Sequence, residues 1–430
     1  MSKTKEYTID NVDEFKIKIL QWSINYNSVA ILDSNNYNSD KYSKYDYIAG
    51  IDAVKELKLT QYKGSFNKLK DFKQNNKNYI FGYFAYDLKN DIEDLKSDNS
   101  DNLQFPILHF FEPAYLIKIK GKSLFITSNN NIDKIFNQIN TQIIINSDIK
   151  PNFFTPVLSK KEYINTVNKL KQHIQLGNIY EINFCQEYYT TVKEFIPTSV
   201  YSNLMKISPT PFSAFYKTDN NFLISATPER FIKKTGQTVI SQPIKGTIKR
   251  DIDSERDLQL IKKLKNDKKE LSENVMIVDL VRNDMSKFAK KGTVNVDELF
   301  EIYTFPQVHQ MISTVTAEIE KTNNSIDIIK EMFPMGSMTG APKIRAMQLI
   351  EKYEKSMRGL FSGAVGYFEP NGDFDFNVII RSLFYNSSNN YLSFQVGSAI
   401  TINSDAEKEY QECLIKAKAI LLATNAKNSI

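Results

Sequence analysis

The sequence has few residues of the kinds that form disulfides and zinc sites. Its 430 residues include two cysteines, Cys185 and Cys413, and three histidines. Two cysteines cannot build a disulfide framework, and so few sulfur and imidazole ligands argue against a zinc centre. Any bound metal is therefore expected to be a hard cation that is held by carboxylates.

The chain also lacks long apolar runs and a strong net charge. No apolar run approaches the ~20 residues that a membrane-spanning helix needs, and the N-terminus does not resemble a secretory signal. The net charge is +5, and the lysines of residues 262–269 stand near acidic residues, as on a solvated helix face. These features predict a cytoplasmic protein that binds neither membranes nor nucleic acid.

The arrangement of apolar residues predicts an α+β fold in two regions. Hydrophobic residues make up 41% of the chain, which is enough for a large core. Strands and helices come in blocks instead of a regular βαβ repeat, and no dinucleotide or P-loop motif is present. We place one region at residues 1–150 and a second at 155–425. Helices are expected over 159–176, 255–282, 342–353 and 406–423, and strands over 182–189, 374–384 and 392–396.

Three glutamates stand out because they share helix faces with apolar residues. Glu273 has apolar residues three, four and seven positions after it, and a buried bare carboxylate needs a partner or a metal. Glu409 and Glu412 are three residues apart, so they repel each other by a few tenths of a kcal/mol unless a cation binds. The alternatives are a helix-edge glutamate that reaches water and a surface pair of Glu412 with Lys416.

Two glycine-containing segments could place backbone or an amine next to a ligand. Residues 336–343 (GSMTGAPK) lead into a helix, whose first N–H groups suit an anion; the alternative is a tight turn with a helix cap. Residues 242–247 (QPIKGT) hold Lys245 between Pro243 and Gly246. Lys245 is either one more surface lysine or a buried nucleophile, whose pKa would fall if other cations lie close to it.

Seven motifs occur in order within residues 159–423, and the ordered set identifies a protein family far more specifically than any single motif. They are GNIYEINFCQ (177–186), SATPERF (225–231), QPIKGT (242–247), ENVMIVDLVRND (273–284), GSMTGAPK (336–343), GAVGY (363–367) and EYQECLIKA (409–417). In these motifs the chain resembles the chorismate-utilising enzymes, which include anthranilate synthase component I, aminodeoxychorismate synthase component I, isochorismate synthase and salicylate synthase. The resemblance implies large antiparallel β-sheets that pack as a sandwich with helices outside.

Lys245 decides which member of the family the chain resembles most. Anthranilate synthases usually have alanine there, whereas lysine is typical of aminodeoxychorismate synthase component I. The resemblance implies that the lysine amine attacks C2 of chorismate as the C4 hydroxyl leaves, and that ammonia then attacks C4. The implied product is 4-amino-4-deoxychorismate, which leads to p-aminobenzoate and folate.

The implied reaction needs a source of ammonia that the sequence itself does not contain. No segment has the cysteine in a glycine elbow that a glutamine amidotransferase requires. A separate glutamine amidotransferase subunit, or free ammonia, is therefore expected. Two alternatives stay open: anthranilate synthase component I, and a catalytically silent subunit that binds chorismate or tryptophan.

The resemblance also implies roles for individual residues. Mg²⁺ would be bound by Glu273 and Glu412, with Glu409 as a direct or water-mediated ligand, and would hold the ring carboxylate. The other carboxylate of chorismate would be held by Tyr367 and Arg381. Glu229 would be the general acid for the leaving hydroxyl, and His309 would be an active-site histidine. The remaining substrate contacts would come from Thr339, Gly340 and Gly397.

Two positions depart from the family pattern. Gly397-Ser398-Ala399 stands where Gly-Ala-Gly is frequent, so the backbone there is expected to approach the substrate less closely. Glu181 stands where amino-transferring members often have glutamine and where isochorismate synthases have a general-base lysine. Its extra negative charge near the substrate is tolerable if Glu181 faces Lys245 or Lys343.

Overall fold

The computed structural model describes residues 2–37, 40–144, 149–150, 152–305 and 308–426, and its strands join in one continuous system. The first ten strands are β1 (Lys3–Thr8), β2 (Ser28–Asp33), β3 (Tyr47–Leu59), β4 (Ile80–Phe84), β5 (Leu108–Lys120), β6 (Ser123–Ser128), β7 (Thr155–Pro156), β8 (Glu181–Thr191), β9 (Ser213–Thr218) and β10 (Asn221–Ser225). The others are β11 (Arg230–Thr235), β12 (Thr238–Gln242), β13 (Ile244–Lys249), β14 (Asn295–Thr304), β15 (Val308–Glu318), β16 (Gly340–Ala341), β17 (Ala364–Phe368), β18 (Phe374–Asn377), β19 (Ser382–Asn386) and β20 (Tyr391–Ile400).

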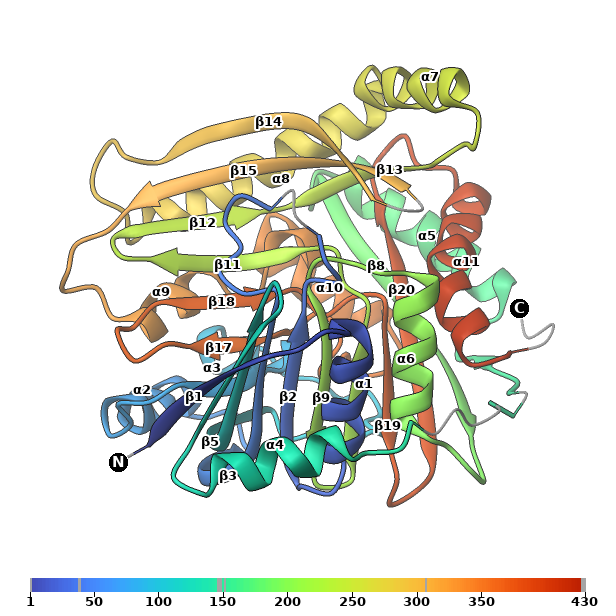
Figure 1. The fold of residues 1–430 in the computed structure, drawn as a ribbon. Helices are drawn as coiled ribbons and strands as arrows, with labels where there is room; N and C mark the ends of the chain where they lie inside the picture. The colour runs from blue at the N-terminus through green and yellow to red at the C-terminus, as the bar shows by residue number, and fades with distance from the viewer. Residues whose placement is uncertain (1, 38–39, 145–148, 151, 306–307, 427–430) are drawn as a thin grey trace.

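Helices cover the outside of this strand system (Figure 1). They are α1 (Val12–Ser23), α2 (Ser65–Gln74), α3 (Lys89–Ile92), α4 (Ile132–Asn140), α5 (Lys160–Gln175), α6 (Pro197–Ile207), α7 (Ser254–Lys265), α8 (Lys268–Ser286), α9 (Ser325–Met332), α10 (Lys343–Tyr353) and α11 (Ala406–Ala423). Two 3₁₀ turns, η1 (Tyr86–Leu88) and η2 (Gly336–Met338), complete the regular structure. Among the described residues, no helix is long and apolar enough to cross a membrane.

The strands form two antiparallel branches that meet at the long strand β5. One branch runs from β5 through β3, β2, β9, β10, β19 and β20 to β8. The other runs from β5 through β4, β17, β18, β11 and β12 to β15, which also pairs with β13 and β14. In Figure 1 the strands of the second branch run across those of the first. The expected antiparallel sandwich with outer helices is therefore confirmed.

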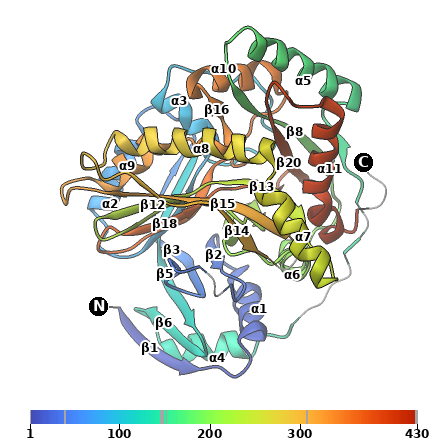
Figure 2. The same cartoon turned by 90° about the horizontal axis from the view of Figure 1, so that it is seen from above.

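Two apolar cores hold the layers together. One lies between the branches and is rich in aromatic side chains such as Phe84, Phe110 and Phe376. The other packs α1, α4, α5, α6 and α11 onto the outer face of the first branch, with Tyr163 and Ile420 among its fully buried members. Helix α8 lies against β13 and β15 on the second branch (Figure 2).

The observed elements correct two of the expected ones. The helix expected over 255–282 is two helices, because α7 ends at Lys265 and Asp267 caps α8 by accepting hydrogen bonds from the N–H groups of Lys269 and Glu270. The strand expected over 374–384 is also broken, and Arg381 between β18 and β19 has a positive φ of 50°. By contrast, Ser159 forms the capping box of α5.

Strands from both expected regions take part in the same branches. β2 pairs with β9, and β4 pairs with β17. Residue 151, next to the expected boundary, lies outside the described residues. The division into regions 1–150 and 155–425 stays a prediction, although each region supplies neighbours for strands of the other.

Candidate active site

Lys245 is buried and forms an ion pair with Glu181. Its Nζ atom donates a hydrogen bond of 2.6 Å to Oε1 of Glu181, and the two residues are 9% and 1% exposed. Burial alone would lower the pKa of Lys245, but the charges of Glu181 and Glu273 outweigh burial and raise it above the ordinary lysine value. Of the two alternatives for Lys245, the structure shows the buried one, and its charged neighbours raise its pKa because the acids outweigh any cation.

The GSMTGAPK segment fixes the backbone of Glu181. Its strand β16 pairs with the start of β8, where Gly340 and Ala341 lie opposite Ile182 and Glu181. Gly340 has a φ of 152°, and a Cβ atom there would lie 2.2 Å from the carbonyl oxygen of Glu181. Only glycine allows this approach, so the close packing of β16 on β8 helps to hold Glu181 beside Lys245.

A buried arginine, Arg358, connects the same segment to β8 through hydrogen bonds. The Arg358 guanidinium donates to the carbonyl oxygens of Met338 (2.6 Å) and Asn183 (2.8 Å) and to the carboxylate of Glu354. Glu354 in turn accepts the N–H of Cys185. Because all of these groups are paired, Arg358 is a structural support of the site and has no spare donor for an anion.

Glu229 is a buried carboxyl that keeps its proton up to neutral pH. It is 4% exposed. Burial raises its pKa to about 7, and the Ser337 hydroxyl and the charges of Lys245 and Arg381 oppose that rise only in part. A carboxyl with a pKa near neutrality suits general acid catalysis.

Arg381 is a cation of the site whose guanidinium has no partner among the described residues. It is half-buried, with a positive φ of 50°, and non-glycine residues with such backbone geometry cluster at functional sites. No hydrogen bond or ion pair between described residues involves the Arg381 guanidinium, and Glu229 is the charge that acts on it. A planar guanidinium without a partner is suited to bind a carboxylate.

Glu273 and Glu409 converge on one lysine. Nζ of Lys269 lies 3.0 Å from Oε1 of Glu409 and 3.7 Å from Oε1 of Glu273. The two glutamates are 2% and 5% exposed, and Oε2 of Glu409 and Oε1 of Glu273 have no hydrogen-bond partner. Burial raises the pKa of Glu273 to about 7. Two buried carboxylates that share a cation and retain unpaired oxygens fit the oxygen ligands that Mg²⁺ prefers.

Glu412 makes its ion pair with another lysine, although its charge also acts on Lys269. Its side chain is 40% exposed and forms a 2.8 Å ion pair with Lys416, as the surface alternative predicted. Lys416 also donates to the carbonyl oxygen of Gly397. Within the described ranges, no three acidic or histidine side chains come together as a ready metal site. Lys269 thus joins Glu273 and Glu409, while Glu412 is paired with Lys416, and the expected Mg²⁺ set stays a prediction.

Gly397 and Thr339 serve the packing of the site. A Cβ atom at Gly397 would lie 2.3 Å from Sγ of Cys185, so glycine lets β20 approach β8 closely. Thr339 is fully buried, and its hydroxyl donates to the carbonyl oxygens of Met335 and Gly336. Its side chain therefore stabilises the turn, and a contact of this hydroxyl with the substrate stays a prediction.

The contacts of His309 and Tyr367 do not involve Lys245, although His309 lies on β15, the strand that pairs with β13. Both ring nitrogens of His309 are hydrogen-bonded, to Asp257 and to Thr304. Tyr367 packs among the rings of Tyr45, Tyr79 and Phe81, and the carboxylates that act on its phenol are Asp375 and Glu369. The roles that the resemblance implied for both residues stay predictions.

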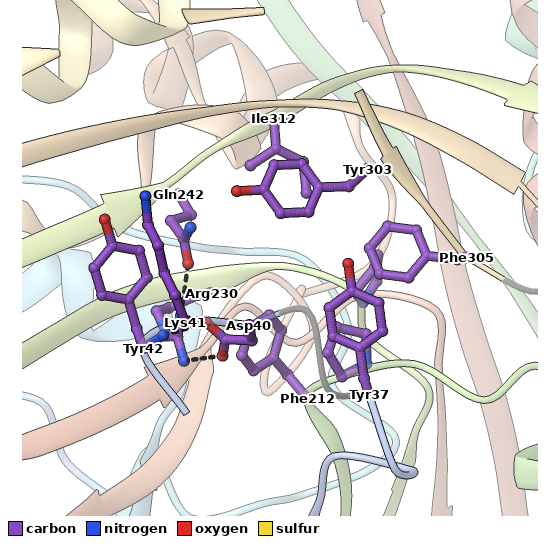
Figure 3. Close-up of a pocket in the computed structure, with 12 residues that line it drawn as sticks. Tyr37, Asp40, Lys41, Tyr42, Phe212, Arg230, Gln242, Tyr303, Phe305 and Ile312 are labelled. Atoms are coloured by element: carbon purple, nitrogen blue, oxygen red, sulfur yellow. Dashed lines mark hydrogen bonds and ion pairs between the residues drawn. The ribbon is translucent and has the colours of Figure 1, made fainter. Parts of the chain in front are cut away.

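A pocket lined by aromatic residues lies elsewhere, around Arg230 (Figure 3). Figure 3 shows Arg230 bonded to Gln242 and Asp40, and Asp375 completes its pairing. Because the charge of Arg230 is already neutralised, the pocket offers an anion no free cation from this residue. None of the acidic residues around Lys245 lines it.

Three residues around the site carry features that the sequence pattern did not reveal. Lys269 lies four residues before Glu273 in α8, and an i, i+4 ion pair could have been expected from that spacing. Arg358 stands four residues after Glu354, but only the structure shows that both are buried. Gln310, next to His309, is fully buried with an unpartnered Oε1, and its Nε2 lies 3.4 Å from the Thr247 hydroxyl.

Comparison with known proteins places nearly the whole chain in one family. A family described as chorismate binding enzyme matches residues 26–422. The anthranilate synthase component I-like protein of Synechocystis is 34% identical over 80% of this chain and 72% of its own length. Aminodeoxychorismate synthase component 1 of Escherichia coli is 30% identical over 79% of this chain and 75% of its own length.

The fold agrees with a solved relative. The crystal structure of anthranilate synthase component I from Streptococcus pneumoniae superimposes with a TM-score of 0.79. The match covers 89% of this chain and 93% of that one at 24% identity. At this identity the match concerns the fold, and the reaction has to be argued from the side chains around Lys245.

Proposed function

The chain belongs to the family of chorismate-binding enzymes, and on that basis we propose that it acts as an aminodeoxychorismate synthase component I. It would convert chorismate and ammonia into 4-amino-4-deoxychorismate for p-aminobenzoate and folate synthesis. The ammonia would come from a separate glutamine amidotransferase subunit. The observation that carries the proposal is a buried lysine, Lys245, among acidic residues that include a carboxyl with a pKa of about 7.

Lys245 is the nucleophile of the proposed reaction. Its unprotonated amine attacks C2 of the chorismate ring, the two conjugated ring double bonds shift, and the C4–O bond breaks. The product of this half-reaction is a covalent adduct between Nζ and C2. Ammonia then attacks C4, and the C2–N bond breaks to release the lysine. Burial of Lys245 supports this role because it excludes water from a nitrogen that must compete with water for the ring.

Glu229 supplies the proton that the departing hydroxyl needs. A hydroxide ion is a poor leaving group, whereas water leaves readily once the oxygen is protonated. The buried Glu229 carboxyl, with its pKa raised to about 7, is still protonated in a large fraction of molecules at neutral pH. The charges of Lys245 and Arg381 act on it, which supports its placement beside the reacting ring.

Charge complementarity accounts for the two carboxylates of chorismate. Arg381, with its unpaired guanidinium, is proposed to bind the carboxylate of the enolpyruvyl arm. Glu273 and Glu409 are proposed to hold Mg²⁺ in place of the Lys269 ammonium, with Glu412 joining after a change of rotamer. When bound, Mg²⁺ supplies a positive centre for the ring carboxylate.

Anthranilate synthase component I is the nearest rival, since relatives of both kinds match the chain at similar identity. That enzyme forms its amine at a different ring position and eliminates pyruvate. Lys245 favours amination at C4, because a nucleophile placed at C2 blocks that position. A silent binding subunit is less well supported, because a site without chemistry has no need of a buried acid and amine.

Product identification tests the proposal directly. The purified protein is incubated with chorismate, an ammonium salt and Mg²⁺, and the products are separated and identified by mass. We expect 4-amino-4-deoxychorismate and no anthranilate. Without ammonium, denatured protein should carry a chorismate-derived mass on the peptide that contains Lys245.

Each alternative gives a different result in the same assay. Fluorescent anthranilate without any added lyase would establish the anthranilate synthase reaction instead. No consumption of chorismate would establish the silent subunit. Lys245→Ala is the matched variant: it should lose the adduct and nearly all product, while normal turnover by it would refute a covalent route.

A further inference from the structure

Glu181 has a chemical environment that the proposed reaction does not yet explain. It is 1% exposed, and its Oε1 accepts the hydrogen bond from Lys245. Its Oε2 is also buried and has no hydrogen-bond partner. A buried carboxylate oxygen without a donor costs free energy, so the fold retains a group here that packing alone does not favour.

The protonated lysine in the structure is the wrong form for catalysis. An ammonium group has no lone pair, so Lys245 must lose a proton before its nitrogen can attack carbon. The proton needs an acceptor inside the site, since both residues are shielded from water. Glu181 is the one carboxylate in the described part of the chain that is bonded to Lys245.

We propose that Glu181 is a catalytic base that takes the proton of Lys245 and returns it at the end of each cycle. The inference rests on the proposed covalent route through Lys245. It assigns a function to the position at which this chain departs from the glutamine found in many amino-transferring relatives.

The proton balance closes over one turnover. Glu181 accepts a proton from the ammonium of Lys245, which leaves a neutral amine and a neutral carboxyl. The amine attacks C2, and the C4 hydroxyl leaves as water with the proton of Glu229. Nζ, now bonded to C2, carries two protons and a positive charge. Ammonia attacks C4 as the C2–N bond breaks, which frees a neutral Lys245.

The second half of the cycle restores both acids. The new C4 ammonium gives one proton to the Glu229 carboxylate, and the Glu181 carboxyl returns its proton to Lys245. The sum is chorismate plus ammonia giving aminodeoxychorismate plus water. No other reactant is needed, and the enzyme ends in the ion-paired state that the structure shows.

Other charges around Lys245 are too far away or differently engaged to take this role. No ion pair within 4.0 Å joins Lys245 to any other described acid. The charged groups that act on it or respond to it come from β8, the turn before β11, α8 and α11; they are Glu181, Glu229, Glu270, Glu273, Glu412 and Lys416. Glu229 already has the opposite task, and Glu412 is paired with Lys416.

The pH dependence of adduct formation distinguishes a base from a group that only positions the lysine. Proton transfer inside an ion pair is independent of solution pH. In Glu181→Gln the reactive amine has to form by loss of a proton to water, so its fraction rises about tenfold per pH unit. The rate of adduct formation without ammonium is measured from pH 6 to pH 8 for both proteins. The rate ratio of variant to wild type removes the shared contribution of Glu229.

We expect this ratio to rise about tenfold per pH unit. A constant ratio would overturn the inference, because a positioning residue changes the rate equally at every pH. If the wild type itself forms no adduct, the proposed function fails before the inference is reached. The two failures are therefore distinct.

Two further variants guard the interpretation. Glu181→Asp keeps a carboxylate, so its ratio to wild type should not depend on pH even if the shorter side chain slows the reaction; a ratio that rises with pH would contradict the inference. Glu187→Gln is the matched control: Glu187 is buried in the same strand and bonded to Tyr391, away from Lys245. It should leave both the rate and its pH dependence unchanged.

Discussion

Lys245 and Glu181 form a 2.6 Å ion pair between β13 and β8, with both side chains almost entirely removed from water. Their strands belong to different branches of the sheet system, so the pair is a contact between the two layers. A buried pair of this kind is costly to break by removing one partner only. Variants of the pair therefore allow its contribution to the free energy of unfolding to be measured separately from its contribution to the reaction rate.

The stability of the pair is tested by a double-mutant cycle. Lys245→Met leaves a buried carboxylate without its cation and should lower the free energy of unfolding by about 3–5 kcal/mol. Adding Glu181→Gln removes the uncompensated charge and should recover most of that loss. Urea unfolding of the four proteins measures both effects. Independent, additive losses would mean that the two charges do not interact.

The ionisation of Glu229 should set the alkaline limb of the pH–rate profile. A general acid works only in its protonated form, and the protonated fraction of Glu229 falls as pH rises through its pKa of about 7. The rate of adduct formation by wild type should thus fall about tenfold per unit well above pH 7. Glu229→Gln should reduce the rate by about 10²–10⁴-fold and lose this limb. A limb that persists in the variant would assign it to another group.

Lys269 should compete with Mg²⁺ for Glu273 and Glu409. Removing the ammonium in Lys269→Gln frees both carboxylates, so the Mg²⁺ concentration for half-maximal activity should fall. Glu273→Gln removes a ligand and should raise that concentration by about tenfold or more. Calorimetric titration should rank the Mg²⁺ affinities of the three proteins in the same order, without relying on turnover. Identical Mg²⁺ titrations for all three proteins would exclude metal binding at this pair.

Gly340→Ala should disturb the contact that holds Glu181. The new methyl group would meet the carbonyl oxygen of Glu181 at 2.2 Å, and such overpacking costs about 1–3 kcal/mol. We expect a lower Tm and slower adduct formation. Gly121→Ala is the control: Gly121 also has a positive φ, but nothing lies within 4 Å of its Cβ position. Equal effects of the two changes would show that only backbone strain matters.

Tyr367→Phe and Arg381→Gln should differ in their effect on the chorismate KM. The Tyr367 ring packs among other tyrosines, so the loss of its hydroxyl should change the chorismate KM by less than about twofold. Arg381→Gln removes the unpaired cation and should raise the KM by about tenfold or more, since a hydrogen bond between charged groups contributes ~1.5–3 kcal/mol. A large effect of Tyr367→Phe would restore it to the substrate site.

Helix α11 shows how far periodicity alone can go. Its apolar spacing predicted residues 406–423, and the observed helix is Ala406–Ala423. The same spacing did not predict the break between α7 and α8, because Asp267 can either continue a helix or cap the next one. Local propensity is nearly neutral at such a residue, and the packing of α8 against β13 and β15 decides it.

The site residues divide in a similar way. Motif order identified Lys245, Glu229, Arg381, Glu273 and Glu409, which the structure places as buried or half-buried charged groups in one region. The roles implied for His309 and Tyr367 stay predictions, because a motif gives the position in the chain and not the direction of a side chain. On a strand, a shift of one residue reverses the face to which a side chain points.

The sequence by itself determined the family, the α+β class and the inventory of acids and bases, because these depend on residue identity and spacing. Only the tertiary structure decided which of those charges meet. Lys245 and Glu181 are 64 residues apart in the chain, and Lys269 and Glu409 are 140 apart. Their distances follow from how the two branches pack, and burial then decides which groups keep or lose their protons. That long-range packing is a property of the whole fold, so no local pattern could have supplied it.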